Sequence, residues 1–218
     1  GMGGFAAPDY TDLASSVYDI RALDANEDGD MDLAVSQNSL GEVVIFLGDG
    51  EGGFTSNGSY NTGNASWLEL GDINDDQHID IAVANSQSIL LGAGDGTFTI
   101  QSIAGIGGNT HLLIEDMDLD GQPDIVRANQ SVSGVFGPGR VTVYSLNESL
   151  VITDTWDIDE GSVGGFKALV HDFNHDGLPD VASTDVNYNG VWVLLNSTDA
   201  TCTAPEIIGS TGNPPTLC

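Results

Sequence analysis

The chain has 218 residues, of which 40% are hydrophobic and 7% aromatic, enough to fill the core of one sizeable domain or two small ones. Its 33 Asp and Glu residues stand against four basic ones, Arg21, Arg127, Arg140 and Lys167, for a formal net charge of -29. This balance excludes nucleic acid and anionic membranes as direct partners, because both need clustered cations. The apolar runs are far shorter than the roughly 20 residues that span a bilayer, so we expect no membrane insertion.

A nine-residue string rich in aspartate recurs four times, about every 50 residues. An alternating apolar segment precedes each string and a β-branched run follows it, and both patterns predict strands. A third apolar segment completes each repeat, and Gly-rich turns that end at Phe54 and Phe98 open a fourth strand. The strings are residues 24–32 (DANEDGDMD), 72–80 (DINDDQHID), 116–124 (DMDLDGQPD) and 172–180 (DFNHDGLPD).

Taken in chain order, the predicted strands are 17–23, 32–36 and 42–48; 66–71, 80–85 and 88–94; 110–115, 124–129 and 140–146; and 166–171, 180–185 and 190–196. Four strands in about 50 residues, without helical periodicity, predict an all-β fold, a β-propeller with four blades of about four antiparallel strands each. We expect a single repeat domain over residues 1–218, with repeats at about 13–62, 63–106, 107–160 and 161–208 and a tail at 201–218.

The two ends of the repeat array allow more than one way for the propeller to close. Residues 3–5 (GGF) match residues 52–54, so residues 3–12 are expected to form an outer strand. That strand either closes a four-bladed ring or belongs to a blade of a larger propeller. The fourth repeat lacks a clear outer strand unless residues 203–208 supply one.

The repeated string has the composition of a calcium loop. Calcium binds about six to eight oxygen ligands, so a loop must bring several carboxylates together without leaving them mutually repelled. Positions 1, 3, 5 and 9 offer such oxygens: Asp24, Asn26, Asp28 and Asp32; Asp72, Asn74, Asp76 and Asp80; Asp116, Asp118, Asp120 and Asp124; and Asp172, Asn174, Asp176 and Asp180. Position 7 is expected to bind through its backbone carbonyl, which frees its side chain to vary: Asp30, His78, Gln122 and Leu178.

Position 6 is glycine in three strings, as a turn with positive φ requires, and Gln77 in the second. Metal-free Asp/Asn/Gly turns are the alternative interpretation. However, 16 of the 33 acidic residues lie in the four strings, and such crowding is unfavourable unless a cation offsets it. We therefore predict up to four calcium ions, with the third loop binding most tightly because it offers four carboxylates, and the second most weakly.

With flanking apolar strands and GDGxxF-type turns, these DxNxDGxxD and DxDxDGxxD loops resemble the FG-GAP/VCBS repeats of integrin α-chain propellers. The resemblance covers roughly residues 3–200. It implies a β-propeller with metal between the first and second strands of each blade, on one rim, and a role in extracellular adhesion or carbohydrate recognition. Integrin-like propellers have seven blades, whereas this chain has material for four. It also departs from the pattern at Gln77 and in an insertion at 131–139.

The predicted innermost strands suggest a second site. Residues two, four and six positions before each string, such as Ile20, Leu68, Leu112 and Ala168, are mostly apolar and are expected to pack sheet against sheet. The residues one, three and five positions before each string point to the opposite side of the strand. They include two of the four basic residues and two of the four histidines. Because burying unpaired charges is costly, we expect them to meet around a central channel, either as ion pairs that fill it or as a ligand pocket. The candidate pocket residues are Arg21, Trp67, Glu69, His111 and Lys167.

The function predicted from these features is a calcium-binding β-propeller module of a secreted or cell-surface protein. We expect it to bind an extracellular protein or a glycan, and oligomers remain an option. The alternative is a catalytic or non-catalytic domain of an extracellular polysaccharide-degrading enzyme, for which Asp19, Glu69 and Glu115 would be the carboxylates. The sequence has no GxSxG, HExxH or P-loop motif, so an enzyme is the weaker hypothesis. Gly1 precedes Met2, so a signal peptide upstream of this sequence is compatible with it.

Overall fold

The computed structural model describes residues 12–13, 15–106, 111–129, 140–159, 165–185, 190–196 and 206–208. Within these ranges the chain forms sixteen strands and no helix, so nothing in them is a helix long and apolar enough to cross a membrane. The expected outer strand at 3–12 lies outside these ranges except for Asp12. The two cysteines of the sequence, Cys202 and Cys218, also lie outside them.

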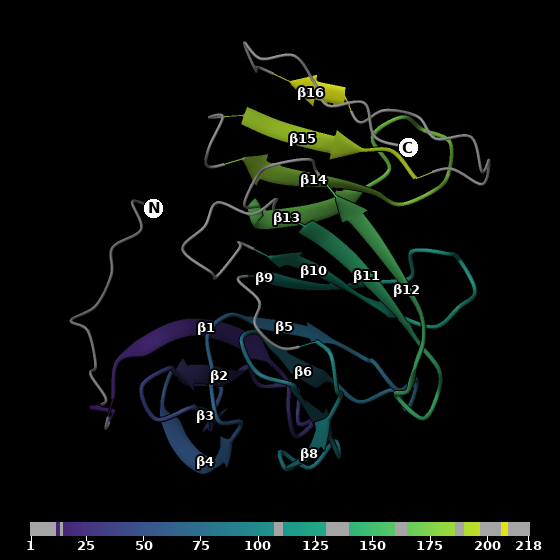
Figure 1. Cartoon of the computed structure of the whole chain (residues 1–218). Helices are drawn as coiled ribbons and strands as arrows, with labels where there is room; N and C mark the ends of the chain where they lie inside the picture. The colour runs from purple at the N-terminus through teal and green to yellow at the C-terminus, as the bar shows by residue number, and fades with distance from the viewer. Residues whose placement is uncertain are drawn as a thin grey trace, which may run out of the picture.

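The strands form four antiparallel sheets, each with its four strands side by side in chain order (Figure 1). The first sheet contains β1 (Val17–Leu23), β2 (Asp32–Gln37), β3 (Glu42–Gly48) and β4 (Phe54–Asn61). The second contains β5 (Leu68–Gly71), β6 (Asp80–Val83), β7 (Ser88–Gly92) and β8 (Phe98–Ser102). The third contains β9 (His111–Glu115), β10 (Asp124–Asn129), β11 (Arg140–Leu146) and β12 (Ile152–Asp159). The fourth contains β13 (Gly165–His171), β14 (Asp180–Asp185), β15 (Gly190–Leu194) and β16 (Glu206–Ile208).

All four repeats fold with the same register. In each sheet the residue just before the aspartate string pairs with the last residue of that string, as Leu23 does with Asp32 and Gly71 with Asp80. The third and fourth sheets repeat this pairing at Asp124 and Asp180. The string is therefore the turn of a β-hairpin, as the sequence predicted. Residues 206–208, within the region predicted to supply the outer strand of the fourth repeat, form β16 and pair with β15.

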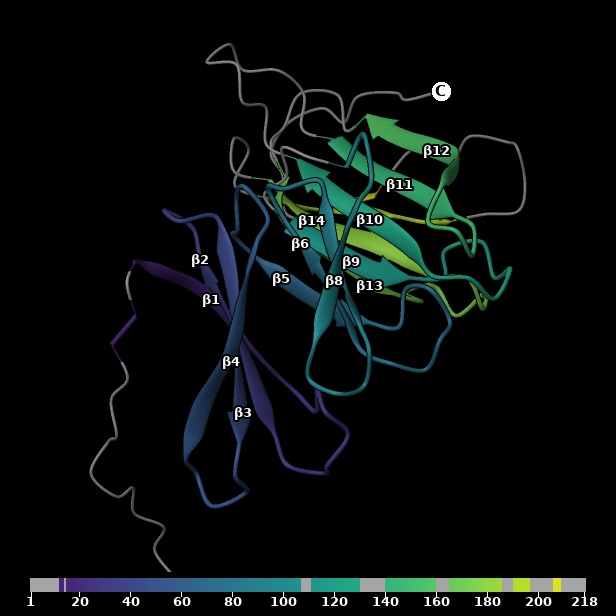
Figure 2. The ribbon, with the colours of Figure 1, turned by 90° about the horizontal axis from the view of Figure 1, so that it is seen from below.

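Neighbouring sheets pack through apolar faces. β1 contacts β5, β5 contacts β9, and β9 contacts β13, so the first strands of the four sheets follow one another through the molecule. Three clusters of buried side chains fill the spaces between the first and second, the second and third, and the third and fourth sheets. Figure 2 shows the first sheet standing beside the second, with the third and fourth beyond it.

In three repeats, the apolar residues expected at sheet contacts do pack the first strand of one sheet against the preceding sheet. Leu68, Leu112 and Ala168 are 1%, 2% and 3% exposed, each against the preceding sheet. The same expectation was wrong for the first sheet, where Tyr18 and Ile20 are 49% and 53% exposed. The reason is topological: the first sheet has no preceding sheet within the described chain.

Candidate functional site

The four acidic loops (residues 24–32, 72–80, 116–124 and 172–180) share one backbone conformation. Positions 4 and 6 of each loop have positive φ. Position 6 is Gly29, Gly121 and Gly177, with φ between 89° and 92°, and Gln77 adopts φ 74° at the equivalent place. The glycine preference predicted for position 6 is confirmed, and Gln77 follows the same turn at a steric cost.

Backbone amides hold the first carboxylate of each loop in place. In the first loop Asp24 accepts hydrogen bonds from the N–H of Asp28 at 3.1 Å and of Gly29 at 3.0 Å. Asp28 in turn accepts the N–H of Asp30 at 2.9 Å. The other three loops repeat this pattern at distances between 2.8 and 3.2 Å. Positions 1 and 5 are thus oriented by the turn itself.

Position 3 distinguishes the third loop from the others. In the first loop Asn26 Nδ2 donates to Asp28 Oδ2 at 2.7 Å, and the asparagines of the second and fourth loops make the same bond at 2.9 Å. Asp118 has no such donor. Its carboxylate lies with Asp116 and Asp120 in a group whose ligand oxygens are within 4.8 Å of one another, and that group could hold a metal ion. Partial burial and then the charges of Asp120 and Asp116 raise the pKa of Asp118.

The aspartate at position 9 ties the loop to the sheet. Asp32 is fully buried and accepts the N–H of Ala25 and of Gly48, both at 2.8 Å. Asp80 does the same with Ile73 and Gly92. Burial is the main cause that raises the pKa of Asp80 to about 6. The equivalent Asp124 is likewise raised to about 6. A nearby cation would favour the charged form of these buried carboxyls.

One contact links two acidic loops. His78 Nδ1 lies 2.6 Å from Glu27 Oε1, which joins position 7 of the second loop to position 4 of the first. This hydrogen bond raises the pKa of His78. At position 7 of the first two loops, the side chains of Asp30 and His78 lie against Gly50 and Gly94, the equivalent glycines of the two Gly-rich turns.

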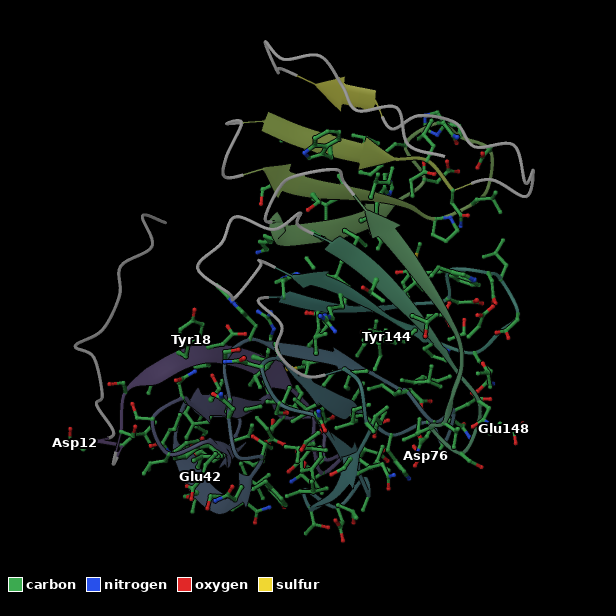
Figure 3. The ribbon with its side chains drawn as sticks, viewed as in Figure 1. Asp12, Tyr18, Glu42, Asp76, Tyr144 and Glu148 are labelled. Carbon is green, nitrogen blue, oxygen red and sulfur yellow. The ribbon has the colours of Figure 1, made fainter. Side chains whose placement is uncertain are left out.

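The five residues of the candidate pocket come together with Asp19 in what we call the inner-strand cluster: Asp19, Arg21, Trp67, Glu69, His111 and Lys167. The guanidinium of Arg21 is 3.4 Å from Asp19 and 3.5 Å from Glu69, and its Nε donates to the Leu68 carbonyl at 2.8 Å. Lys167 Nζ lies 5.8 Å from the centroid of the Trp67 ring. Tyr18, whose ring contacts Trp67 of this cluster, lies far from Asp76 of the second acidic loop (Figure 3).

His111 is the buried member of the cluster. It is 3% exposed, its ring meets the Trp67 ring edge at a centroid distance of 6.1 Å, and its Nδ1 has no hydrogen-bond partner among the described residues. Burial, followed by the charges of Lys167 and Arg21, lowers the pKa of His111 to about 4. The imidazole is therefore neutral at physiological pH. Burial also raises the pKa of Glu69, while Arg21 opposes that shift.

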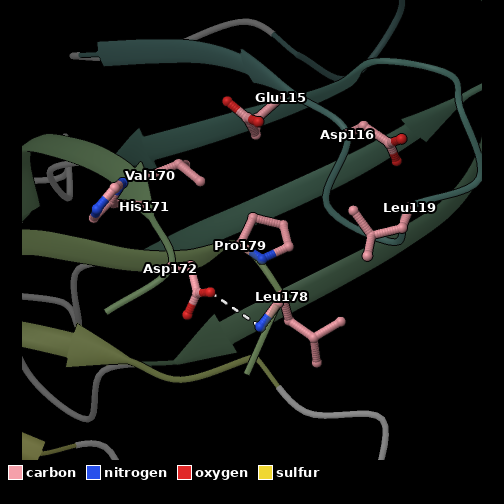
Figure 4. Close-up of a pocket in the computed structure, with 9 residues that line it drawn as sticks. Glu115, Asp116, Leu119, Val170, His171, Asp172, Leu178 and Pro179 are labelled. Carbon is pink, nitrogen blue, oxygen red and sulfur yellow. Dashed lines mark hydrogen bonds between the residues drawn. The ribbon is translucent and has the colours of Figure 1, made fainter. Parts of the chain in front are cut away.

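Two features were not found from the sequence. Tyr18 packs edge-on against Trp67 at a centroid distance of 5.5 Å, across the boundary between the first and second sheets. A cavity of about 280 Å³ lies between the third and fourth acidic loops (Figure 4), lined by Glu115, Asp116, Leu119, Val170, His171, Asp172, Gly177, Leu178 and Pro179. Of the three carboxylates considered for catalysis, Asp19 and Glu69 approach Arg21, whereas Glu115 lines this cavity. The one available signal was that Glu115 and His171 both directly precede an acidic loop.

The comparisons with known proteins agree with the repeat structure. A family model described as FG-GAP-like repeat matches residues 24–83 and again residues 72–127. Each match runs from the start of one acidic loop past the next. A search of curated proteins finds no significant match. With their repeated loops, common register and these two matches, residues 24–127 of the chain belong to the FG-GAP-like repeat family.

Proposed function

We propose that this chain is a calcium-stabilised β-propeller module of a secreted or cell-surface protein, and that it acts by binding rather than by catalysis. The observation that carries the proposal is the common geometry of the four acidic loops. Each loop orients the carboxylates at positions 1 and 5 by backbone N–H groups. None of the four strings contains Lys or Arg that could neutralise them.

The donor set fits calcium. The side chains at positions 1, 3, 5 and 9 supply only oxygen ligands, which a hard cation prefers, and the position 7 carbonyl would add one more. The tight group of Asp116, Asp118 and Asp120 supports a metal at the third loop in particular. FG-GAP repeats typically occur in extracellular proteins, where free calcium is abundant, which supports the same assignment.

A thermal melt in chelator and then in excess calcium tests this function, with the bound metal counted after dialysis. Calcium that binds only the folded state must raise the melting temperature. We expect a large upward shift and three or four ions per chain, and a smaller shift with magnesium, which demands stricter octahedral geometry. An unchanged melt with no bound metal would show that the acidic loops are only turns.

The inner-strand cluster is the candidate surface for recognition. Trp67 offers a ring edge and face beside paired charges, and aromatic rings with polar neighbours suit the apolar and hydroxyl faces of a sugar. Glycan-array binding by the calcium-loaded protein, lost in Trp67→Ala but kept in Trp156→Ala, would support this surface. Trp156 is the matched control, since it is 37% exposed on β12.

An enzyme domain is the second hypothesis, and one observation favours it. Asp19 and Glu69 both approach Arg21, and the pKa of Glu69 is raised, as a general acid requires. Turnover of a polysaccharide panel tests it. Activity that disappears in Glu69→Gln would favour catalysis, whereas binding without turnover would favour the binding module.

A further inference from the structure

Hydrogen bonds from the fourth sheet hold the third acidic loop as well as the fourth. Asn196, which follows β15, donates its backbone N–H to Asp180 Oδ1 at 2.7 Å, the carboxylate at position 9 of its own loop. Its side-chain Nδ2 donates to the carbonyl of Met117 at 2.8 Å, at position 2 of the third loop. One residue therefore joins the third loop to the fourth.

The turn after the third strand of the second sheet makes the same two kinds of bond. The N–H of Gly92 donates to Asp80 Oδ1 at 2.8 Å, at position 9 of the second loop. The N–H of Gly96 donates to the carbonyl of Ala25 at 2.8 Å, at position 2 of the first loop. Strand register places Gly92 and Asn196 at the same position of the repeat. The first loop is therefore joined to the second as the third is to the fourth.

The turn between β7 and β8 fits between the first two loops because it is built from glycine. Gly94 and Gly96 have φ values of 69° and 82°, which favour glycine. A Cβ on Gly94 would fall 2.5 Å from His78 Nδ1 and 2.9 Å from Glu27 Oε1, the atoms that link the two loops directly at 2.6 Å. The turn thus lies against both loops at once.

Within the described residues, the third sheet makes no such connection to the second loop. Register places Leu146 at the equivalent position, where it is buried in one apolar cluster with Ile73. The next residue, Asn147, accepts two N–H groups of its own turn. No hydrogen bond of the described chain joins residues 72–80 to β9, β10, β11 or β12.

From this pattern we infer that calcium binds in two coupled pairs of loops, the first with the second and the third with the fourth, while the second and third loops bind it independently. The coupling elements are residues 92–96 in the second sheet and Asn196 in the fourth. The inference rests on the proposed function, since it concerns calcium in these loops. It goes further by giving a positioning role to residues outside the four strings.

The coupling follows from where the bonds act. Position 2 lies between the ligands at positions 1 and 3, so a donor on its carbonyl fixes the peptide that joins them. A loop held in this way loses less conformational freedom when it is loaded, which raises its affinity. When the fourth loop is loaded, Asp180 is fixed as a ligand, and with it the backbone of Asn196 and its bond to Met117. Linkage makes the effect reciprocal within each pair.

Calcium titration followed by NMR tests the pairing with one loop disabled at a time. Asp76→Ala and Asp176→Ala each remove an exposed ligand, from the second and the fourth loop. Salt at 0.15 M screens charge effects between groups more than about 8 Å apart. The N–H at position 6 donates to the position 1 carboxylate in every loop, so its signal reports on its own loop: Gly29, Gln77, Gly121 and Gly177.

The two disabled loops should affect different neighbours. We expect Asp76→Ala to lower the calcium affinity of the first loop about fivefold and to change that of the third loop by less than about twofold. Asp176→Ala should lower the affinity of the third loop by a similar factor and leave the first loop unchanged. Equal effects of Asp76→Ala on the first and third loops, or no effect on either, would overturn the pairing.

A substitution outside the loops tests the coupling element itself. Asn196→Leu gives the fourth sheet the residue that the third sheet has at this position, and it removes the bond to Met117. In this background Asp176→Ala should change the affinity of the third loop by less than about twofold, an uncoupling that destabilisation alone would not produce. Asn147→Ala is the matched control and should leave the coupling in place. Circular dichroism checks the fold, and Asn196→Ala repeats the test with a smaller side chain.

The outcomes separate the coupling from calcium binding as such. Coupling between the third and fourth loops that persists in both Asn196 variants would overturn the role of Asn196. Four loops that each bind calcium independently would overturn this inference and leave the proposed function standing. A chain that binds no calcium at any loop would overturn both.

Discussion

The acidic loops and the inner-strand cluster handle charge in opposite ways. The loops gather carboxylates with no Lys or Arg in the same strings, and backbone amides, asparagines and the two histidines His78 and His175 moderate the repulsion. The cluster instead sets Arg21 and Lys167 beside Asp19 and Glu69, so its formal charges cancel.

The two regions should therefore depend on different solution conditions. Under the proposed function the loops take up a cation, so their stability should depend on calcium. The cluster is balanced internally, and its buried neutral His111 makes it sensitive to pH instead. The predictions below change one region at a time, to find whether the two respond independently.

The largest effect is expected from the buried aspartate that anchors the first loop. Asp32→Ala leaves the N–H groups of Ala25 and Gly48 without their acceptor, which should lower the free energy of unfolding by about 3–5 kcal/mol. Urea unfolding in chelator measures this without any metal. Asp30→Ala, at a less buried position of the same loop, should cost under about 0.5 kcal/mol. Equal and small losses would mean that Asp32 matters only with metal bound.

The cluster should respond to acid through His111. Its pKa in the folded protein, about 4, lies below the ordinary value near 6.5, so protonation favours the unfolded chain. The contribution of His111 is fully present above about pH 6.5 and is lost as the pH falls towards 4, by up to about 3 kcal/mol. Comparing the pH dependence of unfolding in the wild type and His111→Gln isolates this contribution. Parallel curves would contradict it.

The repeated sequence made the fold largely predictable. The alternation before each string, the β-branched run after it and the position of Asp32 or Asp80 at its end predicted the hairpin that the structure shows. The sequence also predicted that Arg21, Trp67 and Glu69 share a face, because strand parity assigns every second residue to one side.

The burial of individual side chains and the contacts between neighbouring sheets were not predictable in the same way. Parity places His111 on a face but does not say that it is 3% exposed, since burial depends on how closely the second and third sheets approach. The Tyr18–Trp67 contact and the exposure of Ile20 likewise depend on which sheet stands beside which. Such contacts join residues about 50 positions apart, and no local pattern encodes them.

An exchange at position 3 tests why the third loop differs from the first. Asp118→Asn supplies the amide donor that Asn26 provides in the first loop and removes one ligand charge. Calcium affinity of the third loop should fall about tenfold, while the metal-free protein should gain about 0.5–1 kcal/mol of stability. Asn26→Asp should produce the reverse at the first loop. Site-resolved calcium titration measures both, and a second loop that fills before the third would contradict the ranking.

The smallest effect is expected where the second loop departs from the repeat. Gln77 adopts φ 74° where the other loops have glycine, and a side chain in this region costs about 1 kcal/mol. Gln77→Gly should therefore stabilise the chelated protein by about that amount, less the flexibility that glycine adds to the unfolded chain. Gly121→Ala is the matched control. No neighbouring atom lies within 4 Å of its added Cβ, so its destabilisation reports the φ of 92° alone. If the two changes do not have opposite signs, the backbone of position 6 is not what distinguishes the second loop, and its calcium affinity must be explained by its ligands.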